Sequence, residues 1–160
     1  MAVGSGVLPE FPAIRGIRLG VAEAGIKKAD RKDLVLIELQ AGSTCAGVFT
    51  KNAFCAAPVT LSKRHQIASF VNSQKSKSSC SYLLINTGNA NAGTGKQGMA
   101  DALLSCESVA KLFSVDADQV LPFSTGVIGE KLPIEKIQKG LSSVASDLNE
   151  THWLEAAEGI

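Results

Sequence analysis

The residues whose chemistry stands out are Ser124, Thr125 and Gly126, which separate the apolar segments 120–123 and 127–128. The order Ser-Thr-Gly is typical of a turn, in which a side-chain hydroxyl and a backbone N–H can point into one space. Two preorganised hydrogen-bond donors in one place stabilise the negative oxygen that develops during acyl transfer. Because most such turns only change the direction of the chain, the rest of the sequence must decide between a structural turn and an oxyanion hole.

A second unusual passage covers residues 86–98 and is rich in glycine and asparagine. It lies between a strand-like and a helix-like segment, and a glycine-rich loop that opens a helix can bind a phosphate group. The spacing, however, matches neither the P-loop nor a well-placed dinucleotide-binding motif. Two interpretations stay open: a small-ligand or nucleotide site, or a tight loop tied down by the amides of Asn86, Asn89 and Asn91.

Cysteine and histidine, the other residues suited to metal binding or nucleophilic attack, are scattered along the chain. The four cysteines and two histidines form no C-x-x-C pair and no zinc-ligand spacing, so we expect neither a metal nor a cofactor. Buried, inert thiols are the expectation for each cysteine. A nucleophile formed by Cys45 or Cys55 with His65, as in a Cys/His hydrolase, stays open as an alternative.

Length and composition restrict the class of protein. A chain of 160 residues is long enough for one domain, so 1–160 is expected to be a single domain. Hydrophobic residues make up 45% and aromatics only 5%, which favours a closely packed, layered α/β fold. The net charge of +1 argues against a nucleic-acid partner, and no apolar run reaches the roughly 18 residues of a membrane span. No secretory signal is visible in 1–12, and unpaired cysteines fit a reducing compartment, so a cytoplasmic location is expected.

Apolar segments predict several strands. Residues 14–26 indicate a bent strand or strand pair with glycines at the kinks, and 34–39 are nearly all apolar and predict a central strand. Residues 45–50 and 56–61 predict two further strands, the second at an edge because it contains a proline. The short links between these strands predict an antiparallel meander.

Helical spacing follows further along the chain. A short helix is predicted over 63–71, and a loop over 73–81. After a buried strand at 82–85, Thr94 and Gln97 match a capping box that precedes a helix over 98–113.

The last elements flank the Ser-Thr-Gly turn. Residues 120–123 predict a short strand that ends in this turn. Pro133 is expected at the first position of a helix that ends near Leu148. Thr151 is expected to cap a third helix, and because the apolar pattern still continues at Ile160, the chain is expected to be cut off there.

Four stretches, in the same order along the chain, resemble the N-terminal part of the ornithine acetyltransferase family, also called the glutamate N-acetyltransferase or ArgJ family. Together they span nearly the whole chain, and the third and fourth are highly specific in combination. The stretches are 16–22, 46–52 with 56–59, 86–95 and 124–129.

The resemblance implies a self-processing acyltransferase in which sheets pack against helices. Family members are made as a precursor that cuts itself into an α chain and a β chain, and the new N-terminal threonine of the β chain is the nucleophile. This threonine takes acetyl from N2-acetylornithine and passes it to glutamate in arginine biosynthesis, and some members also accept acetyl-CoA. The family further suggests an α2β2 heterotetramer.

By the same resemblance, Thr125 through its hydroxyl and Gly126 through its backbone N–H are the oxyanion-hole pair. Asn86 and Asn89 are expected to support the turn, with direct substrate contact as the alternative. The family's Asn-Met-Ala-Thr cleavage motif is not among these residues, so the resemblance implies most of an α chain, active only with its β chain. The alternative function is a non-enzymatic small-ligand or nucleotide-binding domain that uses the loop 86–98.

Overall fold

The computed structural model describes residues 11–76 and 80–160. Strands and helices are mixed along these ranges, as expected for an α/β fold. In chain order the elements are β1 (Ile17–Ala22), β2 (Leu34–Leu39), α1 (Ala57–Ser76), β3 (Tyr82–Asn89), α2 (Gly95–Phe113), the 3-10 helix η1 (Ala117–Gln119), β4 (Val120–Val127), α3 (Ile134–Ser146) and α4 (Trp153–Glu158).

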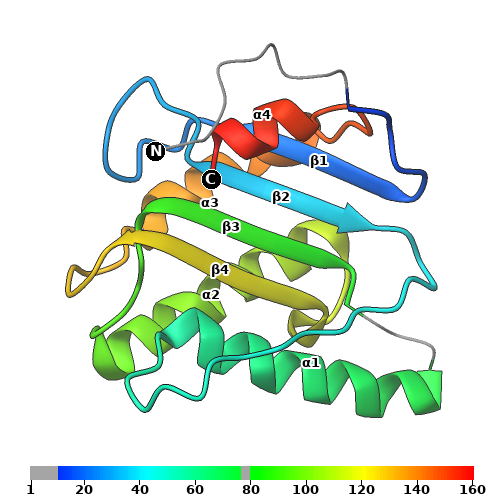
Figure 1. Ribbon diagram of the computed structural model, residues 1–160, viewed down its shortest axis with the longest axis horizontal. Coiled ribbons are helices and arrows are strands. Elements are labelled where there is room, and N and C mark those ends of the chain that lie inside the picture. Colours follow the sequence, from blue (N-terminus) through cyan, green and yellow to red (C-terminus); the bar gives the residue numbers. More distant parts are fainter. Residues whose placement is uncertain (1–10, 77–79) are drawn as a thin grey trace.

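The strands form one sheet in the order β1-β2-β3-β4, with the first three antiparallel and β4 parallel to β3. The parallel pair is connected through α2, as a parallel connection requires. Figure 1 shows α2 and α3 behind the sheet, α4 in front of it near β1, and α1 alongside β4. The sheet is therefore covered on both faces over β1 and β2, and β4 forms one of its edges.

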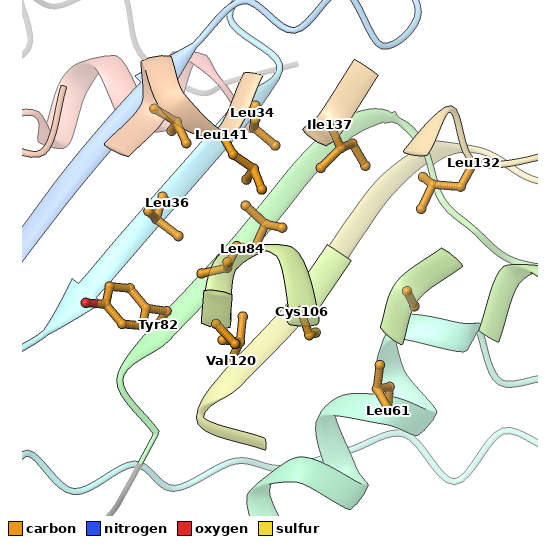
Figure 2. Packing of buried hydrophobic residues seen from close by; sticks show 14 of the residues in the cluster. Leu34, Leu36, Leu61, Tyr82, Leu84, Cys106, Val120, Leu132, Ile137 and Leu141 are labelled. Carbon is orange, nitrogen blue, oxygen red and sulfur yellow. The ribbon is translucent and has the colours of Figure 1, made fainter. Parts of the chain in front are cut away.

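The side chains of the sheet alternate between two apolar clusters. Leu34, Leu36 and Leu84 point to the larger cluster, which α1, α2 and α3 complete (Figure 2). Val35 and Ile85 point to the opposite face, where they pack with Ala156 of α4. Because β2 is buried on both faces, its sequence is almost continuously apolar, and the prediction of a central strand at 34–39 is confirmed.

Two predicted strands are wrong. Residues 45–50 form no regular element, and 56–61 enter helix α1, which also contains the predicted helix 63–71 and continues to Ser76. Pro58 fits both interpretations, because a proline suits the first turn of a helix as well as an edge strand. The predicted short-linked meander is therefore wrong as well: β1, β2 and β3 are antiparallel neighbours, but α1 lies in the connection between β2 and β3. Of the predicted loop 73–81, positions 77–79 lie outside the described residues.

Two predicted helix caps are also wrong. Helix α2 begins after Thr94, but the Thr94 hydroxyl donates to Oδ1 of Asn91 at 2.7 Å instead of capping the backbone. Helix α4 begins after His152, and the Thr151 hydroxyl donates to the side chain of Asn149. In both places a nearby asparagine oxygen accepts the hydrogen bond of the hydroxyl, so local side-chain bonding takes precedence over the cap.

Helix α3 begins at Ile134, directly after Pro133 and one residue later than predicted. Over 11–76 and 80–160, none of the helices has the length and the apolar run needed to cross a bilayer.

Replacing Leu36 by alanine tests the larger core. The Leu36 side chain is completely buried, so we expect the free energy of unfolding to fall by about 2–5 kcal/mol. Leu112 on α2 is 47% exposed, and Leu112→Ala serves as the matched control, with an expected loss below about 1 kcal/mol. Urea unfolding measures both variants, and equal losses would contradict the place given to Leu36.

Candidate functional site

The Ser-Thr-Gly segment lies inside a strand and not in a turn that follows one. Strand β4 runs through Val127, four residues beyond the predicted end, and its register places Thr125 beside Thr87 and Gly126 beside Gly88. The prediction of a turn at this point is therefore wrong. Pairing with β3, which is distant in the sequence, extends the strand through residues that on their own favour a turn.

Helix α1 covers the outer edge of β4 with polar side chains. The Ser62 hydroxyl donates to the carbonyl of Pro122 at 2.7 Å, and Nδ1 of His65 lies 2.8 Å from the carbonyl of Val120. Because a carbonyl only accepts, His65 carries its proton on Nδ1. Ser69, one further turn along the same helix face, donates to the carbonyl of Asp118 at 2.8 Å. The bonds from Ser62 and His65 satisfy carbonyl groups that the edge strand would otherwise leave open, and the bond from Ser69 does the same for a carbonyl of η1.

Backbone groups alternate in direction along the regular part of β4, where the carbonyls of Val120 and Pro122 face α1. At the end of the strand, the carbonyl of Val127 accepts from the N–H of Ala90 on the side of β3 at 2.9 Å. Gly126, between these two parts, is exposed and has a φ of +132°, so its backbone departs from regular strand geometry.

Thr125 carries a hydroxyl next to this glycine. The residue is exposed, and its hydroxyl has no hydrogen-bond partner within 11–76 and 80–160. The hydroxyl of its neighbour Thr87 is engaged, because it donates to the carbonyl of Gly159 at 2.7 Å. The Thr125 hydroxyl and the Gly126 N–H, here called the donor pair, stay a prediction as an oxyanion hole.

Gly126 and Gly88 must both be glycine at this point of the sheet. Their φ angles are +132° and +103°, and a Cβ on Gly126 would lie 2.3 Å from the carbonyl carbon of Gly88. A Cβ on Gly88 would lie 2.7 Å from Cβ of Lys27. Residues with side chains rarely adopt these φ values, and neither glycine has space for a Cβ. The sequence alone did not indicate this pair, because its members lie 38 positions apart.

The asparagines of the loop 86–98 are engaged in hydrogen bonds within the chain. Asn86 donates to the carbonyl of Asn89 at 2.8 Å and accepts from the Ser124 hydroxyl at 2.5 Å, which links β3 to the residue before Thr125. Asn89 donates to the carbonyls of Glu130 and Lys131, at 3.2 and 3.1 Å, and its Oδ1 accepts the N–H of Asn91. Asn86 thus connects β3 to β4, and Asn89 connects β3 to the segment that follows β4.

Asn91 completes this network from a fully buried position. It has a φ of +46°, donates to the carbonyl of Gly98 at 2.8 Å and accepts from Thr94. A Cβ on Gly98 would lie 1.8 Å from the hydroxyl oxygen of Thr94, so the loop is closely filled. Its asparagine side chains therefore bind the protein itself, which leaves few donors for a nucleotide.

Two cavities border the donor pair. A cavity of about 490 Å³ next to Thr125 is mainly apolar and is lined by Val59, Ile85 and Phe123, among others. A cavity of about 420 Å³ next to Gly126 is lined by basic side chains of the loop between β1 and β2. The donor pair thus lies where an apolar and a basic cavity adjoin.

Cys80 and Cys106 are buried, as predicted, whereas Cys45 is half-buried and Cys55 is exposed, so the prediction of a buried thiol is wrong for these two. Burial raises the pKa of the Cys106 thiol to about 12, and burial together with the neighbouring Cys45 thiol does the same for Cys80. His65, the base in the hydrolase alternative, holds β4 through Nδ1 and is itself buried. Among the described residues, no cluster of three or more His, Cys, Asp or Glu side chains is placed to hold a metal ion.

Comparison with known proteins points to one family. The sequence pattern of the ArgJ family matches residues 18–160. The chain is 51% identical over 160 residues to the arginine biosynthesis bifunctional protein ArgJ of Pseudomonas fluorescens, and 52% identical over 147 residues to that of Methylococcus capsulatus. These alignments cover 100% and 92% of this chain but only 37% and 34% of the relatives, so the chain spans little more than a third of their length.

Solved structures share the fold. The crystal structure of ornithine acetyltransferase from Mycobacterium tuberculosis, complexed with ornithine, superposes with a TM-score of 0.81 at 32% identity, over 91% of this chain and 75% of that one. ArgJ from Bacillus halodurans superposes with a TM-score of 0.68 at 29% identity, over 86% and 71% of the two chains. The layered α/β fold that the resemblance implied is thereby confirmed.

Replacing Gly126 by alanine tests the glycine pair, and Gly129→Ala is its matched control. Both residues have a positive φ, but a Cβ on Gly129 would meet nothing within 4 Å. Each substitution adds backbone strain, and we expect Gly126→Ala to lose about 1–3 kcal/mol more in free energy of unfolding because of the clash with Gly88. Thermal or urea unfolding of both variants measures the difference. Equal stability of the two would contradict the close approach of β3 and β4.

Proposed function

Because this chain belongs to the ArgJ family, we propose that it is the α chain of an acetyltransferase of arginine biosynthesis and that it supplies the oxyanion hole. The observation that carries the proposal is that Thr125 and Gly126, the donor pair, lie at consecutive exposed positions near the end of β4. Further support comes from the printed names of its relatives, an ornithine acetyltransferase and bifunctional arginine-biosynthesis proteins.

The reaction consists of two acyl transfers with similar intermediates. A threonine hydroxyl at the N-terminus of a partner β chain attacks the acetyl carbonyl of N2-acetylornithine, with the free amine of that threonine as base. The C–N bond breaks, ornithine leaves with the proton, and an acetyl-threonine ester remains. The amine of glutamate then attacks this ester and regenerates the hydroxyl. In members that use it, acetyl-CoA replaces acetylornithine as the donor.

Both tetrahedral intermediates carry a negative oxygen, and both present it at the same place. Thr125 and Gly126 donate to this oxygen as the charge develops, so they stabilise the transition state more than the neutral substrate. The backbone donor is fixed by the strand, and Asn86 fixes the preceding residue through Ser124. This scheme uses no metal and no cofactor.

The assembly follows from the division of chemistry between the chains. The β chain comes from the same precursor by self-cleavage, and two copies of each chain form an α2β2 heterotetramer in the cytoplasm. The alternative, a nucleotide-binding domain using 86–98, is less well supported because the asparagine amides of that loop are engaged within the chain.

Thr125→Ala tests the oxyanion role in the full-length protein. We expect kcat to fall about 10²- to 10³-fold, as is typical for the loss of one such donor, with little change in stability because the side chain is exposed. Thr125→Ser keeps the hydroxyl and should recover most of the rate. An alanine variant within threefold of wild type in the acetylornithine-to-glutamate assay would remove this role.

Self-cleavage is tested by intact mass and N-terminal sequencing of the purified protein. We expect a companion polypeptide that begins with threonine, because an N-terminal threonine combines nucleophile and base in one residue. An uncleaved or companion-free protein that still transfers acetyl would overturn the assignment of the nucleophile to a β chain.

A further inference from the structure

Two of the four cysteines are far apart in the sequence but adjacent in the fold. Cys45 belongs to the irregular segment 40–56, here called the β2–α1 loop, and Cys80 comes two residues before β3. In the folded chain the Cys45 thiol adjoins the Cys80 thiol, and neither is in a disulfide. The proposed acetyl transfer uses neither thiol, so the pair has no role in the function described so far.

Helix α1 and the sheet bring the two cysteines together. Gln66 of α1 donates to the carbonyl of Cys45 at 3.5 Å, and the residue before it contacts the carbonyl of Val120 at the start of β4. Val120 pairs with Tyr82 in β3, and the Cys80 thiol donates to the carbonyl of Tyr82 at 3.6 Å. The position of the pair therefore depends on packed elements and not on the β2–α1 loop alone.

The two thiols differ in their access to solvent. Cys45 is half-buried, whereas Cys80 is only 3% exposed, and burial together with the neighbouring Cys45 raises the pKa of the Cys80 thiol to about 12. A dissolved oxidant therefore reaches Cys45 first, and Cys80 is the adjoining thiol that can react with the product. In a reducing compartment, such a pair is typically a reversible redox sensor and not a permanent structural disulfide.

The β2–α1 loop connects this cysteine pair to the donor pair. Residues 48–50, which follow Cys45 closely, line the apolar cavity of about 490 Å³ that Thr125 also lines. The loop contains no helix or strand, and Figure 1 shows it running beside α1. Contacts such as that of Gly47 with the Gln66 side chain fix its course. A shift at Cys45 therefore reaches the wall of the cavity beside Thr125.

We propose that Cys45 and Cys80 form a reversible disulfide, and that this bond lowers the activity of the site at Thr125. With hydrogen peroxide as the oxidant, the O–O bond breaks, and the Cys45 thiol becomes a sulfenic acid while water leaves. The Cys80 sulfur then attacks the Cys45 sulfur, so that an S–S bond forms and the S–O bond breaks. The hydroxyl leaves as a second water with the Cys80 proton. Two electrons thus pass from the two sulfurs to the peroxide, and an added dithiol reverses the oxidation.

The new bond moves the β2–α1 loop. An S–S bond is about 2.05 Å long, which is shorter than the separation of two unbonded thiols, so Cys45 is drawn toward the start of β3. Residues 48–50 shift with it, and the cavity beside Thr125 changes shape. Because a displacement of about 1 Å in a site can cost about 10²-fold in rate, we expect acetyl transfer to slow. This effect on activity rests on the proposed function, whereas the disulfide itself does not.

The test treats the full-length protein with hydrogen peroxide and then measures both the crosslink and the activity. Trypsin separates the four cysteines onto the peptides 33–51, 52–63, 78–96 and 97–111, so each crosslink is identified directly in an unreduced digest. We expect 33–51 to be joined to 78–96 with the loss of two hydrogens. We also expect kcat/KM to fall about 10-fold and to recover after dithiothreitol.

Three variants accompany the wild type. Cys45→Ser and Cys80→Ala should each prevent both the crosslink and the loss of activity, and the use of two variants guards against a folding defect in either one. Cys55→Ser is the matched control, because Cys55 is an exposed cysteine of the same loop. This control should respond to peroxide and dithiothreitol as the wild type does.

Each other outcome has a distinct meaning. Oxidation of Cys45 without a bond to Cys80 would overturn the pair. A crosslink that leaves kcat/KM unchanged, or a loss of activity that persists in both cysteine variants, would overturn the effect on the site. A reduced wild-type protein that transfers no acetyl would instead overturn the proposed function, while the peptide map would still decide whether the disulfide forms.

Discussion

The site depends on how the backbone of one edge strand is satisfied. Strand β4 has β3 on one side only, so every second carbonyl and N–H along it needs another partner or water. Helix α1 supplies that partner over the first half of the strand through Ser62 and His65. Beyond Pro122 these hydrogen bonds from α1 end, and Thr125 and Gly126 are exposed. A covered edge and an exposed end are thus two parts of the same strand.

The asparagine network connects this edge to the rest of the fold. The loop after β3 lies against the segment that follows β4, and Asn89 connects the two by donating to the carbonyls of Glu130 and Lys131. Asn91 holds the loop itself together by donating to the carbonyl of Gly98. Buried amides that bond in this way stabilise one conformation because an unsatisfied alternative would be expensive. The end of β4 is consequently rigid, which is what an oxyanion site needs, since donors that must reorganise contribute less.

Sequence reasoning predicted the features that apolar patterns encode and missed those that non-local polar contacts decide. The central strand at 34–39 and the amphipathic helix α2 followed directly from hydrophobic spacing. The apolar run 56–61 was compatible with a strand, but it belongs to a helix whose Ser62, His65 and Ser69 bond to β4 and η1 at helical spacing. Thr125 and Gly126 stay predictions as site residues. The Gly88–Gly126 pair and the cavity beside it depend on segments that only the folded chain brings together.

The contacts between α1 and β4 also bear on the order in which the protein can fold. Ser62, His65 and Ser69 bond to residues 60, 55 and 49 positions further along the chain, so their separation in sequence is large. Such contacts have a high contact order, and closing loops of this length slows folding. During synthesis, α1 emerges well before the strand that it covers. Until Pro122 has left the ribosome, this polar face of the helix has no edge to bind.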